Sequence, residues 1–221
     1  TTPAVERPIA STDKVRTVGS PPLVRRRLDA GAAVAGLVVF GLCALVADSH
    51  RVPAAEHAVF SWINGLPDGL TFAAHNLQFL GVLAVGPIVA LIALAARRPR
   101  LAAAALIVTA LKLLTERLVW RVVQRERPGV TEPGALIRAG TPTTGLSFVS
   151  GHVMLVTGLA WCATPHLRGP WRWAPWIAVV LVAFARIYLG AHNPLDVLGG
   201  FGLGLAIGGL TNLIVGVPEA P

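Results

Sequence analysis

The sequence predicts an all-α, polytopic membrane protein in which six transmembrane helices form one bundle. Its 221 residues are 54% hydrophobic and only 14% charged, whereas soluble domains usually carry about 25% charged residues. The apolar residues also come in long blocks, each close to the roughly 20 residues that a helix needs to cross a bilayer. These blocks should be helical, because an open strand would leave unpaired backbone groups in lipid.

Six apolar blocks divide the chain. They cover residues 30–47, 72–96, 101–119, 150–167, 173–190 and 194–217. Residues 28–217 are therefore expected to form a six-helix membrane domain. Residues 1–27 are polar and proline-rich, which predicts a disordered cytoplasmic tail. The shorter stretch 54–66 mixes apolar and polar residues and is expected to form an interfacial helix.

The net charge of +8 could indicate a nucleic-acid partner, but the basic residues cluster beside the apolar blocks. That pattern is typical of cytoplasmic loops and of contact with anionic lipid. Membrane lipids are therefore the expected partners, and nucleic acid is not. Cys43 and Cys162 each lie inside an apolar block, so we expect reduced packing residues rather than a disulfide.

Arginines predict how the chain crosses the membrane. They flank the first block at Arg25–Arg27, join the second and third blocks at Arg97–Arg100, and lie at Arg168 and Arg172 between the fourth and fifth. The positive-inside rule places these segments on the cytoplasmic side of a cell membrane, with the inverted orientation as the alternative. The loop over residues 121–151 then lies outside. It nevertheless holds four arginines: Arg121, Arg125, Arg127 and Arg138. Cations on the disfavoured side suggest that they bind an anion.

Charged residues lie between the last two apolar blocks, where His192 and Asp196 are four positions apart. Pro194 is a favourable first helical residue, which places Asp196 in the first turn of the last helix. Its carboxylate can then reach the His192 ring, fix the tautomer and make the other ring nitrogen a better nucleophile. The alternative is a plain helix cap formed by Asn193 or Asp196.

A second element, Ser150–Gly151–His152, opens the fourth block. A hydroxyl and free backbone N–H groups at a helix N-terminus suit a phosphate, and glycine lets the backbone approach it closely. His152 would point to the same place and could donate a proton. The alternative is that Ser150 is an ordinary N-cap.

Arginines form the third element. Guanidinium groups match phosphate oxygens with paired hydrogen bonds, and Arg125 and Arg127 lie at the end of the third block. Arg186 would add a second guanidinium from the fifth block, where a buried and unpaired charge is costly. The alternative for Arg125 and Arg127 is a solvated helix end. Under the predicted topology all three elements meet at one membrane face.

These elements, in this order, resemble the type 2 phosphatidic acid phosphatase superfamily. The pattern of that family is K-x6-R-P, then P-S-G-H, then S-R-x5-H-x3-D. The matching residues here are Arg127, Pro128, Ser150, Gly151, His152, Arg186, His192 and Asp196. Val149 and Ala185 replace the motif proline and serine. The resemblance covers about residues 30–215.

The motif lysine is missing, because Trp120 stands at its position. Arg121 is the next residue and is expected to contact the phosphate instead. The alternative is that Trp120 packs at the membrane interface and Arg121 faces water. Lys112 lies roughly 22 Å from Arg127 on a continuous helix, so we expect it to pair with Glu116 inside the third span.

The resemblance implies a two-step phosphatase that uses no metal and no cofactor. His192 would attack phosphorus to form a phosphohistidine, oriented by Asp196. His152 would protonate the leaving oxygen and then activate water. The phosphate oxygens would be held by Arg121, Arg127, Arg186, Ser150 and Gly151.

A membrane core favours a lipid phosphate as substrate, cleaved on the extracytoplasmic face. Polyprenyl pyrophosphate, phosphatidic acid and phosphatidylglycerol phosphate all fit this description. One alternative is a phosphotransferase that passes the group to an acceptor other than water. Another is a catalytically weak lipid-binding or translocating relative, an idea favoured by Trp120. The sequence leaves the identity of the lipid and the oligomeric state open.

Overall fold

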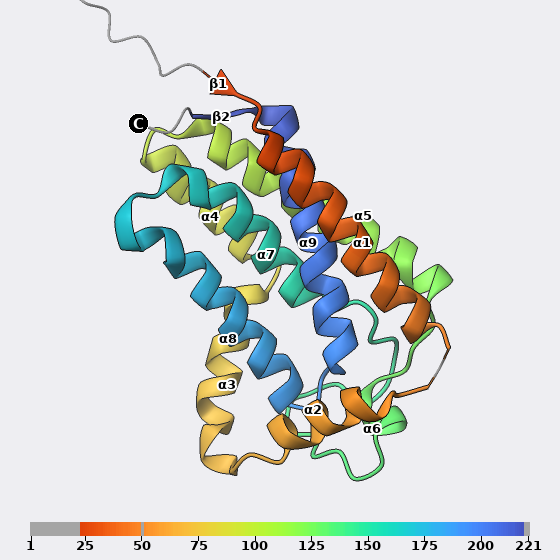
Figure 1. Ribbon diagram of the computed structural model, residues 1–221. Helices are drawn as coiled ribbons and strands as arrows, with labels where there is room; N and C mark the ends of the chain where they lie inside the picture. Colours follow the sequence, from red (N-terminus) through yellow and green to blue (C-terminus); the bar gives the residue numbers. More distant parts are fainter. Residues whose placement is uncertain (1–22, 50, 219–221) are drawn as a thin grey trace, which may run out of the picture.

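The computed structural model describes residues 23–49 and 51–218, and this part of the chain is mostly helical (Figure 1). The α-helices are α1 (Arg27–Ala47), α2 (Ala54–Asn64), α3 (Thr71–Gln78), α4 (Val85–Ala95), α5 (Pro99–Val122), α6 (Pro128–Thr131), α7 (Gly151–Ala163), α8 (Ala174–Tyr188) and α9 (Pro194–Val215). The 3-10 turns are η1 (Asp68–Leu70), η2 (Phe79–Gly81), η3 (Thr164–His166) and η4 (Gly169–Trp173). Two short strands complete the described chain: β1 (Leu23–Val24) and β2 (Val217–Pro218).

Each predicted span falls on a helix, but the helices differ in length and polarity. Among the described residues, α1 and α9 are long and apolar enough to cross a membrane by length and composition. A bent pair is a third candidate, formed by Asp68–Gly81 and Val85–Ala95 at an angle of 63°. By contrast, α7 has 13 residues and α8 has 15, and α5 carries charged residues in its second half. The helical class is therefore confirmed, while six complete spans remain a prediction.

Helix α9 lies at the centre, beside α1 and α7 (Figure 1). Glycines on both sides allow the close approach that small residues give membrane helices. A Cβ atom added to Gly202 would lie 2.8 Å from the carbonyl oxygen of Gly36 on α1, and one added to Gly204 would lie 2.5 Å from that of Met154 on α7. Cys43 and Cys162 are free thiols buried in this core, as expected.

The span between α3 and α4 is broken at η2. The break brings Gly81 against α7, because a Cβ atom on Gly81 would lie 2.8 Å from the Cβ atom of His152. The end of α3 therefore lies next to the first turn of α7, where His152 is located. A polar residue at the end of α3, Gln78, is thereby brought close to the predicted site.

The predicted disordered tail is partly ordered within the described residues. Leu23 and Val24 pair antiparallel with Pro218 and Val217, and Arg25 Nε donates to the carbonyl oxygen of Leu213 at 2.9 Å. These backbone contacts hold the two ends of the described chain at the same end of the bundle (Figure 1). Residues 1–22 of the predicted tail lie outside the described residues.

At the opposite end, α2 packs across the start of α9 (Figure 1). Its buried residues Glu56, Phe60 and Asn64 are four positions apart and so share one face. The helix expected over residues 54–66 is confirmed as a helix, and its interfacial position remains a prediction. The Asn64 side chain bonds the backbone of Leu136 and Tyr188, which ties α2 to the loop before α7 and to the end of α8.

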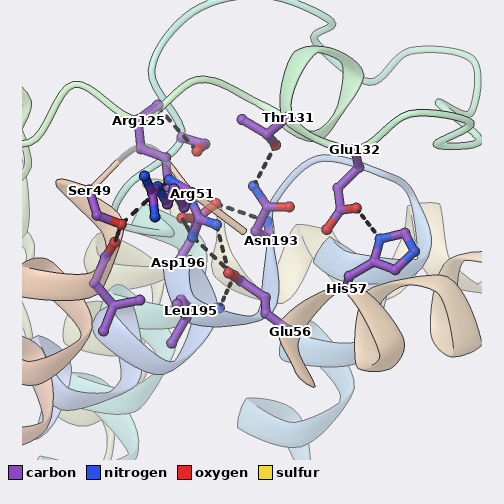
Figure 2. Close-up of polar contacts among 12 residues, drawn as sticks. Ser49, Arg51, Glu56, His57, Arg125, Thr131, Glu132, Asn193, Leu195 and Asp196 are labelled. Carbon is purple, nitrogen blue, oxygen red and sulfur yellow. Dashed lines mark hydrogen bonds and ion pairs between the residues drawn. The ribbon is translucent and has the colours of Figure 1, made fainter. Parts of the chain in front are cut away.

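A buried ion pair fastens α2 to the rest of the protein (Figure 2). Arg125 Nη1 and Nη2 donate to Glu56 Oε1 and Oε2 at 2.9 and 2.7 Å, and Nη1 also donates to Asp196 Oδ1 at 3.3 Å. Burial acts to lower the pKa of Arg125, but the two carboxylates outweigh it and raise that pKa. Arg125 is thus neither a solvated helix end nor a free phosphate ligand, because both arms of its guanidinium are used by carboxylates.

Arg138 is also occupied within the protein. It donates to the carbonyl oxygens of Tyr188, Asn64 and Leu66, and its guanidinium lies 3.6 Å from the centre of the Tyr188 ring. It also forms an ion pair with Asp68 at 3.4 Å. Of the four arginines in the 121–151 loop, Arg125 and Arg138 therefore stabilise the loop itself and are not available to bind an anion.

The stability of the bundle should depend on the close contact between α9 and α1 at Gly202. We expect Gly202→Ala to lower the free energy of unfolding by about 1–2 kcal/mol, because its Cβ atom would overpack against the backbone of α1. The same change at Gly41, where an added Cβ meets nothing within 4 Å, is the matched control. Thermal unfolding in detergent measures both, and equal unfolding temperatures would contradict the close contact.

The buried Arg125–Glu56 pair should contribute more to the free energy of unfolding than an exposed charge does. We expect Glu56→Gln to cost about 3–5 kcal/mol of stability, because it leaves a buried guanidinium without its principal partner. Glu126→Gln is the control, since Glu126 lies next to Arg125 in the chain but is exposed. Chemical denaturation of the two variants gives the comparison, and a loss below about 1 kcal/mol for Glu56→Gln would show that the pair contributes little.

Candidate active site

Three helix ends meet where the sequence predicted a site. The carbonyl oxygen of Arg186, in the last turn of α8, accepts from the backbone N–H groups of Ala191 and His192 at 3.0 and 3.2 Å. Gly190 allows this turn, because its φ of +75° is one that side chains disfavour. The Ser150 N–H, just before α7, donates to the carbonyl oxygen of Asp196 at 2.9 Å. The starts of α7 and α9 are thereby joined.

His192 and Asp196 lie side by side, both buried. Their closest atoms, His192 Nδ1 and Asp196 Oδ2, are 3.6 Å apart. The same Oδ2 accepts from the backbone N–H of Asn193 at 2.8 Å (Figure 2). The structure therefore shows Asp196 as a cap of α9. The carboxylate also faces the His192 ring, but Nδ1 forms no hydrogen bond with any described residue, so its role in orienting the ring remains a prediction.

The surroundings of His192 favour its neutral form. Burial lowers its pKa well below the usual value, and the positive charges of Arg186 and Arg127 add to this effect. A contact with the backbone of Ser147 acts in the opposite direction. A neutral imidazole has a free lone pair at neutral pH, which is the state that a nucleophile requires.

Arg127 lies half-buried at the start of α6 and reaches toward His192. Its Nε donates to the carbonyl oxygen of Thr144 at 3.1 Å, and its Nη1 donates to that of Ala191 at 2.9 Å. Burial lowers its pKa, while the carboxylates of Asp196 and Glu116 act to raise it. Backbone carbonyls hold this guanidinium in place without neutralising it, so its charge remains available to an anion.

Arg186 is buried within α8, with 5% of its surface exposed. Its Nη1 donates to Gln78 Oε1 at the end of α3. Its Nε is buried and has no hydrogen-bond partner in the described residues. A buried guanidinium with a neutral amide as its partner is costly, and a bound anion would compensate that cost.

Ser150, Gly151 and His152 begin α7 as predicted. The Ser150 hydroxyl is buried and finds no hydrogen-bond partner within the described part of the chain. The positive charges of Arg186, Lys112 and Arg127 act on the His152 ring. A free hydroxyl and the first N–H groups of a helix thus lie beside both histidines.

The second half of α5 contains Lys112, Glu116, Trp120 and Arg121, the residues about which the missing motif lysine raises a question. Lys112 Nζ and Glu116 Oε2 are 2.7 Å apart, so the predicted pair is confirmed. Trp120 has a buried indole N–H with no partner among the described residues. The Arg121 side chain is exposed and makes no hydrogen bond or ion pair within the residues described. Its contact with phosphate remains a prediction.

Two residues of this region were missed by the sequence analysis. Glu56 holds Arg125 and also accepts from the backbone N–H of Leu195 at 2.9 Å, in the first turn of α9 (Figure 2). Its signal was a carboxylate on the same helical face as Phe60. Gln78 holds Arg186, and its only signal was a polar side chain within an apolar block. Among the described residues, no cluster of His, Cys, Asp or Glu could hold a metal ion.

Known proteins resemble this chain in sequence. A family profile described as the PAP2 superfamily matches residues 90–217. A decaprenylphosphoryl-5-phosphoribose phosphatase from Mycobacterium tuberculosis is 30% identical over 178 residues, which cover 76% of this chain and 95% of the relative. An undecaprenyl-diphosphatase from Sulfolobus acidocaldarius is 43% identical over 63 residues, or 28% of this chain and 30% of the relative.

Solved structures share the fold. LpxE from Aquifex aeolicus superposes with a TM-score of 0.59 at 20% identity, covering 70% of this chain and 92% of that one. A transmembrane PAP2 type phosphatidylglycerolphosphate phosphatase from Bacillus subtilis superposes with a TM-score of 0.60 at 24% identity, covering 80% and 94%. Together with the family profile and the mycobacterial relative, these matches show that the chain belongs to the PAP2 superfamily.

Proposed function

We propose that this protein is a membrane lipid phosphatase that works through a phosphohistidine on His192. One observation carries the proposal. A buried, neutral His192 lies beside Asp196 and is flanked by two arginines, Arg127 and Arg186, that have no carboxylate partner among the described residues. That arrangement suits a phosphate, whose charge would complete the site.

The proposed reaction gives each of these groups a role. The free nitrogen of His192 attacks phosphorus, forming a P–N bond as the bond from phosphorus to the leaving oxygen breaks. His152 gives its proton to that oxygen and then takes a proton from the water that cleaves the P–N bond. Asp196 stabilises the imidazolium as it forms. The phosphate oxygens are held by Arg127, Arg186, the Ser150 hydroxyl and the Gly151 N–H, with Arg121 as a further candidate.

The substrate is a lipid phosphate. The mycobacterial relative is a phosphatase of decaprenylphosphoryl-5-phosphoribose, and the Sulfolobus relative is an undecaprenyl-diphosphatase. Polyprenyl phosphates and pyrophosphates, phosphatidic acid and phosphatidylglycerol phosphate are therefore the lipids to assay first. Apolar side chains exposed along α1 and α4 support contact with lipid around this site.

The site lies on the extracytoplasmic face of a six-span protein in the cell membrane. The arginine pattern of the loops supports this orientation, with Arg97–Arg100 and Arg168 on the cytoplasmic side. The short helices α7 and α8 would complete their spans with η3 and η4. Residues 1–27 would then begin the chain on the cytoplasmic side.

Substitution of the two central residues tests the mechanism. We expect His192→Ala to abolish turnover of every lipid phosphate, because it removes the proposed nucleophile. Asp196→Asn should retain a small residual activity, since it removes only the stabilisation of the imidazolium. Release of inorganic phosphate, measured with a chelator present, reports hydrolysis rather than transfer to another acceptor.

Trapping of labelled phosphate identifies the nucleophile directly. The label should appear on His192 after rapid acid-free quenching, because phosphohistidine is acid-labile. Label on a different residue would overturn the assignment. Tight binding of the lipid without turnover would favour the catalytically weak relative instead.

Cysteine labelling tests the orientation. A cysteine at Thr143 should react with an impermeant thiol reagent in intact cells, and one at Arg168 should not. Both positions are exposed, whereas Cys43 and Cys162 are buried and give a low background. The reverse pattern of labelling would place the site on the cytoplasmic face.

A further inference from the structure

The Lys112–Glu116 pair on α5 lies closer to the site than its place in the sequence indicates. Both side chains are only 14% exposed. The sequence analysis set Lys112 aside because of its distance from Arg127 along a continuous helix. Helix α5 ends at Val122, however, and residues 123–127 lead into the loop that carries Arg127. Distance along one helix is therefore the wrong measure.

The packing of α5 on α7 brings the pair to the start of α7. An added Cβ atom on Gly158 would lie 2.7 Å from Val108 Cγ1. Two turns further along α5, Thr115 Oγ1 donates to Met154 Sδ at 3.5 Å. Residue numbers increase along α5 as they decrease along α7, so the two helices are antiparallel. Glu116, which follows Thr115, therefore lies near the first turn of α7.

Contact with Gly151 shows how close the pair lies. A Cβ atom on Gly151 would lie 2.8 Å from Lys112 Cε and 2.9 Å from Glu116 Cδ, and it would collide with Glu116 Oε1. The ion pair thus occupies the space of a side chain at this position, and a larger residue here would displace the Lys112 and Glu116 side chains. The carboxylate of Glu116 lies at the positive end of the α7 dipole, where an anion is favoured.

The two charges also act on the predicted catalytic groups. Lys112 is among the cations whose charge acts on the His152 ring. Glu116 is one of two carboxylates whose charge acts on Arg127. The pair therefore lies among Gly151, His152 and Arg127, three of the residues that the proposed reaction uses.

The residue at position 120 cannot supply a positive charge to the phosphate. Trp120 replaces the lysine of the family pattern, and the neighbouring Arg121 is exposed at the end of α5. Lys112 is two turns earlier on the same helix and is largely shielded from solvent. It is held by a single carboxylate, which a phosphate with its larger negative charge could displace as the partner of the ammonium group.

We propose that Lys112 binds the substrate phosphate in place of the missing motif lysine, and that Glu116 holds it beside Gly151 until phosphate arrives. The inference rests on the proposed function, since it adds a ligand to the same phosphate site. Lys112 thereby completes a set of three cations with Arg127 and Arg186. Arg121 is the rival candidate for this third cation.

The test compares cations along one helix. We expect Lys112→Met to lower kcat/KM by roughly 10- to 100-fold, the loss of one charged hydrogen bond. Arg117→Met is the matched control, because its side chain is exposed on α5, and it should stay within about twofold of wild type. Arg121→Met tests the rival assignment, in which Arg121 rather than Lys112 binds the phosphate. Substrates are phosphatidic acid, phosphatidylglycerol phosphate and a polyprenyl pyrophosphate in detergent micelles.

A second variant separates loss of the cation from the presence of an unpaired Glu116. The double change Lys112→Met/Glu116→Met removes both charges and should remain as impaired as the single variant. Lys112→Arg keeps a cation at this position and should recover most of the activity. Full activity of the double variant would overturn the proposal, because the single variant would then have failed only through an unpaired carboxylate.

The affinity for inorganic phosphate, measured by calorimetry, tests the role of Lys112 without requiring turnover. Its affinity should fall with Lys112→Met and not with Arg117→Met. If wild type hydrolyses none of the three lipids while phosphate affinity still depends on Lys112, the proposed function fails and the assignment of Lys112 stands. An unchanged affinity and kcat/KM for Lys112→Met, or a loss with Arg121→Met alone, would overturn the assignment.

Discussion

The buried guanidinium of Arg125 is the interaction on which the site depends. It binds both oxygens of Glu56 on α2 and one oxygen of Asp196 on α9. Glu56 also accepts from the first turn of α9 through Leu195. One cation and two carboxylates thereby hold the cross-helix α2, the loop after α5 and the start of α9 in one arrangement. That arrangement leaves the other oxygen of Asp196 facing His192.

A division among the arginines follows from this network. Arg125 and Arg138 donate through their Nη atoms inside the protein, to carboxylates or to carbonyl groups. Arg127 and Arg186 are held by neutral oxygens only, so their positive charge is not cancelled. Burial lowers the pKa of His192, and the charges of Arg186 and Arg127 add to that effect. The loop between α5 and α7 therefore contains two structural cations, Arg125 and Arg138, and one cation without a carboxylate partner in the described chain, Arg127, while Arg186 extends from α8.

Spacing along the chain was enough to predict those contacts of the site that join residues within about one helical turn. His192 and Asp196 are four residues apart, and Pro194 starts a helix between them, so their proximity follows from helix geometry. Ser150 and Gly151 open α7 for similar local reasons, and the turn from Arg186 to His192 is closed by Gly190. The helical class also followed from composition. The number of complete spans did not, because α7 and α8 are short and α5 is charged.

The sequence by itself determined the helical class, through composition, and the proximity of His192 to Asp196, through their spacing along one helix end. The order of the motifs carried the family resemblance, and that resemblance, rather than local spacing, pointed to Arg127, Ser150 and His152. Only the tertiary structure decided which arginines are occupied, that Glu56 and Gln78 are their partners, and that Lys112 lies against Gly151. These contacts join segments 35 or more residues apart. They depend on how α2, α3 and α5 pack against α7, α8 and α9, and the register of that packing is set by the shapes of whole helix faces rather than by any local spacing.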